Sequence, residues 1–382
     1  MERHSRIYAE INLDAIEENF ECMRKNISPD TRMIAVIKTD GYGHGAVPIA
    51  RMMEKKEYIW GFAVATAEEA YELRDHQIQK PILILGYTFR EEYGNFARGQ
   101  IRPTVFQLDM AEAMSQAAVK AGETLKIHLA VDTGMTRIGF RDDASSLEII
   151  RRIQKLPGLE IEGLFTHFAK ADEKDKTYTY QQLERYLRFE HMLEEAGVPI
   201  PIRHCSNSAG ILEIPEANLD AVRAGITMYG IYPSEEVARD TVPLRPAMSI
   251  KSHIVYIKEV EAGVPVSYGG TYVTEKRTRL ATIPVGYGDG YPRSLSNKGY
   301  VLIHGKPAPI LGRICMDQFM VDVTRIPEAR ELDEVILMGD SWEARLGVEE
   351  LGALSGRFPY EFVCGIGKRV PRVYKRREPQ AQ

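Results

Sequence analysis

The sequence has few of the features that mark secreted, membrane-spanning or zinc-binding proteins. Its four cysteines are scattered over 382 residues, without a CxxC pair or a Cys/His cluster at zinc-ligand spacing. A disulfide framework is not expected in a chain of this length, so a reducing compartment fits better. No apolar run reaches the roughly 20 residues of a membrane span, and the first residues contain no apolar signal segment. We therefore predict a cytoplasmic protein with no membrane partner and no metal site.

An excess of positive charge and a dinucleotide-binding glycine motif are also lacking. The formal net charge is −5, which argues against nucleic acid as a partner. No GxGxxG sequence is present, and no acidic residue lies at the spacing that a dinucleotide fold uses. With 44% hydrophobic and 27% charged residues, the composition is that of a globular protein able to bury a large core.

Short apolar runs alternate with longer amphipathic segments over the first two thirds of the chain. Eight successive βα-like units favour a (β/α)₈ barrel of the TIM type over an open doubly wound sheet. Helices are predicted at 46–56, 66–75, 110–121, 144–155 and 177–196, with Thr66 as an N-cap and Gly122 and Gly197 as C-terminal stops. The predicted strands are 33–38, 61–65, 81–85, 102–106, 126–131, 162–166, 202–205 and 219–223.

The pattern of apolar and turn-forming residues changes after about Pro243. Alternating apolar stretches are separated by Gly, Pro and Asn turns, which predicts a smaller, mostly β domain with one short helix at 343–354. Prolines cluster between Tyr232 and Pro246, so the predicted domains are residues 1–240 and 241–382. The predicted β stretches are 250–260, 280–285, 301–303, 319–323 and 335–338.

The stretch from Ala35 to Gly45, AVIKTDGYGHG, places a lysine at the end of a predicted buried strand. Desolvation can remove part of the charge of such a lysine, and a lysine in this state can form Schiff bases. The three glycines permit a tight turn before the helix that begins at Ala46. The alternative for Lys38 is an ordinary strand-end lysine that extends into solvent.

Polar residues follow several of the predicted strands at their C-terminal ends, where a barrel carries its functional groups. Lys38 follows the first strand, Asp132–Arg137 the fifth and His167 the sixth. Asn207–Gly210 follows the seventh, and Arg223–Ile226 ends the eighth. The loops after strands seven and eight commonly hold phosphate in barrels, and this pair supplies a serine hydroxyl and accessible backbone N–H groups. Each residue alone has an ordinary structural explanation, and their joint placement favours a phosphate-containing cofactor.

The motif KTDGYGHG closely resembles the lysine motif of the alanine racemases, which are pyridoxal 5'-phosphate (PLP) enzymes of fold type III. Three stretches of the predicted β domain resemble motifs of the same family, in the same order. They are VSYGGTY from Val266, IPVGYGDG from Ile283 and GRICMD from Gly312. The resemblance extends from Tyr8 to Val373, and it implies the barrel, the PLP cofactor and a homodimer with shared active sites.

The resemblance also implies roles for individual residues. Lys38 is similar to the Schiff-base lysine, which is one catalytic base, and Tyr268 to the opposing base from the other subunit. His167 resembles the histidine that bonds this tyrosine, and Arg223 the arginine that faces the pyridine nitrogen of PLP. Further residues match the phosphate site (Tyr42, Ser208, Gly225, Ile226, Tyr360), the substrate-carboxylate site (Arg137, backbone of Met316) and the entrance (Tyr287).

Racemisation gives these roles a physical reason, because the Cα proton leaves one face of the substrate and returns to the other. Tyrosine has a reference pKa of about 10, so a tyrosine base needs its phenolate stabilised by positive charge or a hydrogen-bonding histidine. Arginine stays protonated and leaves the ring nitrogen of PLP unprotonated. PLP is then a weaker electron sink, which favours rapid reprotonation at Cα over transamination.

One position departs from the family pattern. Many members have a carbamylated lysine two residues before Asp132, which orients the substrate-binding arginine, whereas this chain has Ala130. The predicted function is interconversion of L- and D-alanine, an amino-acid substrate, for peptidoglycan synthesis. Three alternatives stay open: a racemase that also accepts serine, a fold-type III decarboxylase and a non-catalytic PLP-binding protein. Tyr268 and Arg223 speak against the decarboxylase, and the β domain speaks against the non-catalytic carrier.

Overall fold

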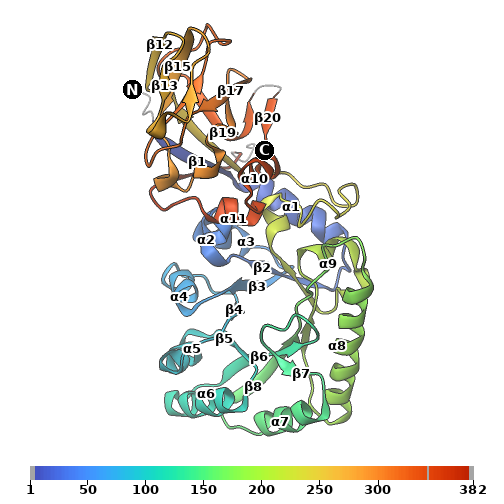
Figure 1. The fold of residues 1–382 in the computed structure, drawn as a ribbon. Helices are drawn as coiled ribbons and strands as arrows, with labels where there is room; N and C mark the ends of the chain where they lie inside the picture. Colours follow the sequence, from blue (N-terminus) through green and yellow to red (C-terminus); the bar gives the residue numbers. More distant parts are fainter. Residues whose placement is uncertain (1–4, 342–343, 378–382) are drawn as a thin grey trace, which may run out of the picture. The chain divides into compact units, whose positions relative to one another are not determined.

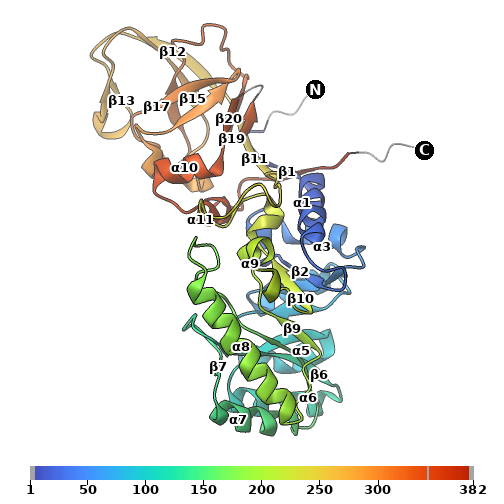
Figure 2. The ribbon, with the colours of Figure 1, turned by 90° about the vertical axis from the view of Figure 1, so that its right-hand side faces the viewer.

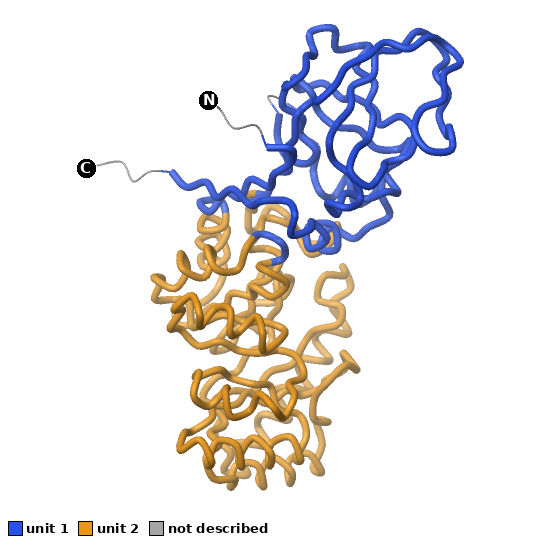
Figure 3. Tube along the Cα trace, turned by 90° about the vertical axis from the view of Figure 1, so that its left-hand side faces the viewer, with its two compact units in different colours: residues 1–15, 42–44, 246–382 blue, residues 16–41, 45–245 orange. Residues whose placement is uncertain are grey.

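The computed structural model describes residues 5–341 and 344–377. These residues form two compact units (Figure 3). The barrel unit comprises residues 16–41 and 45–245, and the β unit comprises residues 1–15, 42–44 and 246–382.

The barrel unit is organised around parallel strands that follow one another in the order β10-β2-β3-β4-β5-β6-β8-β9 (Figure 1). At the two ends of this order, the Arg223 N–H in β10 donates to the Ser206 carbonyl just after β9, at 2.9 Å, so the barrel is nearly closed. The predicted (β/α)₈ barrel is therefore confirmed. The strands are β2 (Arg32–Val36), β3 (Ile59–Val64), β4 (Ile82–Ile84), β5 (Ile101–Val105), β6 (Leu125–Asp132), β8 (Leu159–Phe165), β9 (Ile202–His204) and β10 (Ala221–Ala224), with β7 (Phe140–Arg141) beside β6.

Helices of the barrel unit begin and end at the capping residues that the sequence predicts. The Thr66 hydroxyl accepts the Glu69 N–H, and the left-handed residues Gly122 and Gly197 follow two of the helices. The helices are α3 (Ala46–Met53), α4 (Ala67–Asp75), α5 (Tyr93–Gly99), α6 (Leu108–Ala121), α7 (Ala144–Gln154), α8 (Thr177–Glu195) and α9 (Ser208–Glu213), drawn in Figures 1 and 2. Helix α1 (Leu13–Lys25) and helix α5 were not predicted. Two glycines and a single charge weaken the periodicity of α5.

Strand β3 shows how the barrel packs. All six of its residues are buried, because one face of the strand points into the barrel and the other meets the helices. A Cβ at Gly61 would lie 2.3 Å from the Pro81 carbonyl oxygen, so only glycine allows this approach of neighbouring strands.

The β unit is a mostly antiparallel sheet in the order β12-β15-β18-β17-β16-β19-β11-β1-β21. The first strand, β1 (Ile7–Asn12), pairs antiparallel with β11 and parallel with β21, so the start of the chain belongs to this sheet. The predicted mostly β C-terminal domain is confirmed. The predicted helix 343–354 is α10 (Val348–Ser355), and Trp342 and Glu343 lie outside the described residues. The other elements are β11 (Met248–His253), β12 (Tyr256–Val260), β13 (Pro265–Val266), β14 (Tyr272–Val273), β15 (Thr278–Ile283), β16 (Tyr300–Ile303), β17 (Lys306–Leu311), β18 (Phe319–Asp322), β19 (Glu334–Ser341), β20 (Ala344–Leu346), α11 (Pro359–Cys364) and β21 (Arg372–Lys375).

Within residues 5–341 and 344–377, no helix combines the length and the apolar character that a membrane crossing requires.

Candidate active site

A left-handed turn follows Lys38 at the C-terminal end of β2. Thr39, Asp40 and Gly41 have φ angles of 54°, 49° and 61°, all in the left-handed region. For Thr39 and Asp40 this conformation costs about 1–2 kcal/mol each relative to the right-handed one. Such strain persists only where the surrounding structure holds it, and it concentrates at functional sites.

Glu69 in α4 supplies part of that support. One of its carboxylate oxygens accepts the Thr39 N–H at 2.5 Å, and the other accepts the Ala65 N–H at 2.7 Å. Glu69 therefore ties the left-handed turn to the end of β3, while its own N–H donates to the Thr66 cap. The sequence pattern predicted only the cap.

Arg223 is a buried cation on the same end of the barrel. Its guanidinium donates to the carbonyl oxygens of Thr166 at 2.7 Å, His204 at 2.7 Å and Cys205 at 2.9 Å. Burial lowers the pKa of Arg223 to about 10, so the group remains charged at neutral pH. These three carbonyl acceptors hold the positive charge in a single position.

His167 lies beside Arg223, with 3.4 Å between its Nδ1 and the Arg223 Nη2. Burial, and then the positive charges of Arg223, Arg137 and Lys38, lower the pKa of His167 to about 3. The imidazole is therefore neutral at neutral pH. Because Arg223 can only donate, Nδ1 of His167 is the acceptor, and its proton is assigned to Nε2.

Gln182, a fully buried residue of α8, holds the loop that carries His167. Its Nε2 donates to the His167 carbonyl at 3.1 Å and to the Thr133 hydroxyl at 3.4 Å, and its Oε1 accepts the Ala169 N–H at 2.9 Å. The loops after β6 and β8 are thus joined by one amide side chain.

A buried hydrogen-bonded chain continues from Arg223 into the barrel. Arg223 Nη1 lies 2.9 Å from His204 Nδ1, His204 Nε2 lies 2.9 Å from His128 Nδ1, and His128 Nε2 lies 3.3 Å from Glu162. Burial lowers the pKa of both histidines, so both are neutral. Burial would raise the pKa of Glu162, but hydrogen bonds from His128 and Arg102 outweigh it and lower the pKa to about 2. The carboxylate fixes the tautomer of each histidine in turn.

The loops after β9 and β10 form a cradle of donors. The Ser208 hydroxyl oxygen accepts the Gly225 N–H at 3.1 Å and the Thr227 N–H at 3.4 Å, and it lies 3.0 Å from the Thr227 hydroxyl. The Ile226 N–H makes no hydrogen bond with the residues that the structure describes. A hydroxyl whose lone pairs are occupied and an unpaired amide are both suited to donate to an anion.

Arg137 follows β6 in an exposed loop. The Asp132 carboxylate shapes this loop by accepting the N–H groups of Gly134 at 2.9 Å and Thr136 at 3.0 Å. Among the described residues, Arg137 has no hydrogen-bond or ion-pair partner, and the buried Ala130 cannot supply one.

In the β unit, the turn that carries Tyr268 contacts the loop 313–316. The Ser267 hydroxyl donates to the Arg313 carbonyl at 2.6 Å and lies 3.4 Å from the Cys315 sulfur. Tyr268 itself is 70% exposed. Its phenol is therefore presented by a fixed turn.

Tyr287, which the sequence predicts to lie at the entrance, contacts the same loop through its backbone. The Tyr287 N–H donates to the Cys315 carbonyl at 3.1 Å, and the Gly288 N–H donates to the Met316 carbonyl at 2.9 Å. The N–H of Met316 makes no hydrogen bond with the described residues, so it can donate to a ligand.

The structure thus gathers the predicted site residues into two groups. Tyr42 and Tyr360, with ring centroids 6.2 Å apart, lie in the β unit. The β unit also carries Tyr268, Tyr287 and Met316, whereas Lys38, Arg137, His167, Ser208, Arg223, Gly225 and Ile226 lie in the barrel unit. No set of three His, Cys, Asp or Glu side chains in the described parts of the chain is arranged to hold a metal ion.

Models of two protein domains match this chain. The N-terminal domain of alanine racemase matches residues 11–233, and the C-terminal domain of alanine racemase matches residues 247–374. The chain belongs to the alanine racemase family. Its members are isomerases, so the predicted enzyme class is confirmed and a non-catalytic role is set aside.

Relatives and solved structures of the family align along nearly the whole chain. The alanine racemase of Desulforamulus reducens is 47% identical over 368 residues, covering 96% of this chain and 98% of that protein. An alanine racemase structure from Clostridium difficile 630 is 43% identical with a TM-score of 0.93, covering 97% of this chain and 95% of that one. Another, in complex with cycloserine, is 41% identical with a TM-score of 0.92, covering 98% and 96% of the two chains.

Proposed function

We propose that this alanine racemase interconverts L- and D-alanine with PLP, using Lys38 and Tyr268 as the two bases. The observation that carries the proposal is the convergence on one barrel rim of Lys38, a buried Arg223 and a neutral His167. The pKa of His167 is lowered first by burial and then by positive charges that include Arg223 and Lys38. Paired groups whose environments shift their protonation in this way are typical of catalytic sites.

The donors present at the rim fit PLP. The Ser208 hydroxyl and the unpaired Ile226 N–H would hold its phosphate, while the Gly225 N–H is already used to orient Ser208. Arg223 would face the pyridine nitrogen, and Lys38 would hold the coenzyme covalently. Tyr42 and Tyr360 complete the predicted phosphate site. When bound, PLP withdraws electrons from the substrate and weakens its Cα–H bond.

Two proton-transfer groups are needed because the two enantiomers expose Cα–H on opposite faces. The amine of Lys38 would move the proton on one face, and the phenol of Tyr268 from the partner subunit would move it on the other. The Nε2–H of His167 can donate to the phenolate oxygen and stabilise it, since Nδ1 is directed at Arg223. The fixed charge of Arg223 would keep the ring nitrogen of a bound coenzyme unprotonated.

Arg137 and the Met316 N–H would bind the substrate carboxylate. Both groups are without hydrogen-bond partners among the described residues, so each can donate to the carboxylate oxygens. The exposed phenol of Tyr287 would border the entrance.

The biological setting belongs to the same proposal. We infer a homodimer with shared active sites, because the second base is needed on the face that Lys38 does not reach. D-Alanine would serve peptidoglycan synthesis, and a cytoplasmic location stays a prediction. The division into residues 1–240 for PLP binding and 241–382 for the β domain also stays a prediction.

The decisive experiment follows pure L-alanine in D₂O with the purified protein. For the parent protein we expect a yellow colour from the coenzyme, decay of the optical rotation and deuterium incorporation at Cα. The colour should be lost in Lys38→Ala. Initial rates on L-serine compared with L-alanine separate a broad racemase from a selective one, since one extra atom discriminates by only about 1–3 kcal/mol. Unchanged optical rotation with a fully loaded protein would contradict the proposal, and release of CO₂ would indicate the decarboxylase instead.

A further inference from the structure

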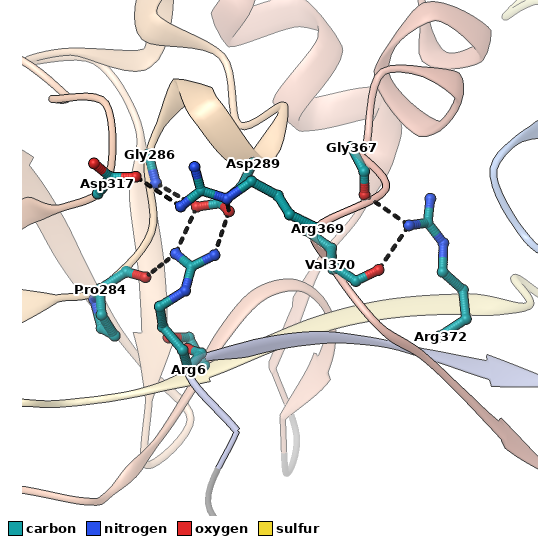
Figure 4. Close-up of polar contacts among 10 residues, drawn as sticks. Arg6, Pro284, Gly286, Asp289, Asp317, Gly367, Arg369, Val370 and Arg372 are labelled. Atoms are coloured by element: carbon teal, nitrogen blue, oxygen red, sulfur yellow. Dashed lines mark hydrogen bonds and ion pairs between the residues drawn. The ribbon is translucent and has the colours of Figure 1, made fainter.

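Asp289 is a fully buried carboxylate in the β unit, at the end of the loop that carries Tyr287. It accepts two hydrogen bonds from the Arg6 guanidinium and one from the Gly286 N–H at 3.0 Å (Figure 4). Arg369 Nε lies 3.0 Å from the same carboxylate. Two arginines and an amide therefore converge on one buried anion.

The cluster joins four segments that are distant in the sequence. Arg6, just before β1, also donates to the Pro284 carbonyl at 2.7 Å. Arg369 also donates to Asp317 at 2.6 Å, beside Met316. The Asp289 carbonyl accepts the Gly367 N–H at 2.8 Å, so the C-terminal segment is held on both sides.

The loops around Asp289 approach each other as closely as backbones can. A Cβ at Gly286 would lie 2.2 Å from the Met316 carbonyl oxygen, and a Cβ at Gly290 would lie 2.0 Å from the Gly365 carbonyl oxygen. With such contacts, a small shift of the Asp289 loop displaces the loop that carries Met316. The Met316 N–H has no partner of its own among the described residues, so its direction depends on these neighbours.

We propose that Asp289, bracketed by Arg6 and Arg369, is the positioning residue that aims the Met316 N–H at the substrate carboxylate and holds Tyr287 at the entrance. The inference rests on the proposed function for the identity of the ligand. It goes beyond that function by assigning substrate affinity to a buried ion cluster that does not touch the substrate. Asp289 acts through the backbone hydrogen bonds from Tyr287 and Gly288 to the 315–316 carbonyls.

The test uses the full-length, cofactor-loaded protein with Asp289→Asn, which keeps the size of the side chain and removes its charge. We expect KM for L-alanine to rise about 10- to 100-fold, the effect of losing an aligned hydrogen bond to a charged group, with kcat changed much less. Amide hydrogen exchange at Tyr287 and Gly288 should accelerate in the absence of substrate. Asp340→Asn is the matched control, because Asp340 also pairs with an arginine but is exposed.

A second variant, Arg369→Met, decides the question if Asp289→Asn does not fold, and it should shift KM and exchange in the same direction. Unchanged exchange at Tyr287 and Gly288 overturns the proposal. Faster exchange with unchanged KM also overturns it, because the cluster would then be only structural. The exchange measurement needs no turnover, so it separates failure of this inference from failure of the racemase function, in which the parent protein itself would not racemise alanine.

Discussion

The barrel unit and the β unit hold their functional side chains in opposite ways. In the barrel, Arg223 and His204 are buried and are fixed by hydrogen bonds between side chains and to carbonyls. In the β unit, Tyr268 and Met316 are 70% and 52% exposed, and hydrogen bonds between neighbouring loops hold the segments that carry them. Replacing a site residue of the barrel should therefore change both activity and the free energy of unfolding. Replacing one of the exposed site residues of the β unit should change mainly activity.

The reason for the difference is the environment of the charge. A cation inside the barrel is useful only if its position is constant, and burial requires that every donor find an acceptor. An exposed phenol pays no such desolvation cost, and its turn alone can direct it. Asp289 is a buried exception in the β unit, and its charge is neutralised by two arginines.

The largest effects are expected on kcat when either of the two proposed bases is replaced. Lys38→Ala and Tyr268→Phe should each lower kcat by about 10²–10⁴-fold, because each removes one proton-transfer group. Tyr268→Phe should leave the free energy of unfolding unchanged within about 0.5 kcal/mol, since the side chain is exposed on its own chain and Phe keeps the ring. Turnover from L- and D-alanine together with urea unfolding would check this. A strongly destabilised Tyr268→Phe would contradict the proposed difference between the barrel unit and the β unit.

The next effect concerns the two arginines of the barrel rim. Arg223→Met should lower the free energy of unfolding by about 3–5 kcal/mol, because the carbonyls of Thr166, His204 and Cys205 lose their donor. Arg137→Met should change it by less than about 0.5 kcal/mol, since Arg137 has no partner among the described residues. Both are measured by denaturant unfolding, and equal effects would contradict the proposed coupling.

An Arg223→Glu variant tests the proposed effect of the Arg223 charge on the coenzyme. If the fixed positive charge suppresses protonation of the coenzyme, the variant should racemise more slowly and transaminate more often per turnover. Pyruvate formation measured beside racemisation reports the ratio. Racemisation at the parental rate without added transamination would refute the assigned role.

The buried chain predicts how stability depends on pH. The pKa of Glu162 is lowered to about 2, so its contribution is present above the unfolded value and is lost as pH falls toward about 2. This contribution is on the order of 2–3 kcal/mol, and Glu162→Gln should remove it. The neutral histidines, with lowered pKa values, should already reduce stability as pH falls below about 6.5, because the unfolded chain binds protons that the folded chain does not.

Unfolding of the parent and Glu162→Gln between about pH 2 and 8 would test these two windows. The two curves should differ most above about pH 4 and converge in acid. If the free energies of unfolding of the two proteins had the same pH dependence, the Glu162 charge would not stabilise the fold.

The smallest expected effect is steric. A Cβ at Gly163 would lie 2.5 Å from His128 Nδ1, so Gly163→Ala should destabilise the barrel by about 1–3 kcal/mol and shift the histidine resonances in NMR spectra. Gly94→Ala in α5 is the control, because a Cβ there meets nothing within 4 Å. It should be neutral or stabilising by up to about 1 kcal/mol.

Most of the predicted strands and helices are present in the structure in the predicted order, because each is indicated by a local pattern of apolar and polar residues. The alternation of apolar runs with amphipathic segments predicts the barrel, and the rule that functional groups follow its strands places Lys38 and Arg223 at one end. Strand β1 was missed as a member of the C-terminal sheet, because its pairing with β11 and β21 joins residues hundreds of positions apart.

The barrel, the β domain, the family and the residue types of the proposed two-base mechanism could all be predicted from the amino-acid sequence. How those residues are held depends on contacts that form in the folded chain. The left-handed turn after Lys38 depends on Glu69 from another helix, and the tautomers of His128 and His204 depend on Glu162. The Met316 loop depends in the same way on a carboxylate contacted by both ends of the chain. Periodicity and turn signals report local conformation, whereas hydrogen bonds between distant residues exist only once the chain has folded.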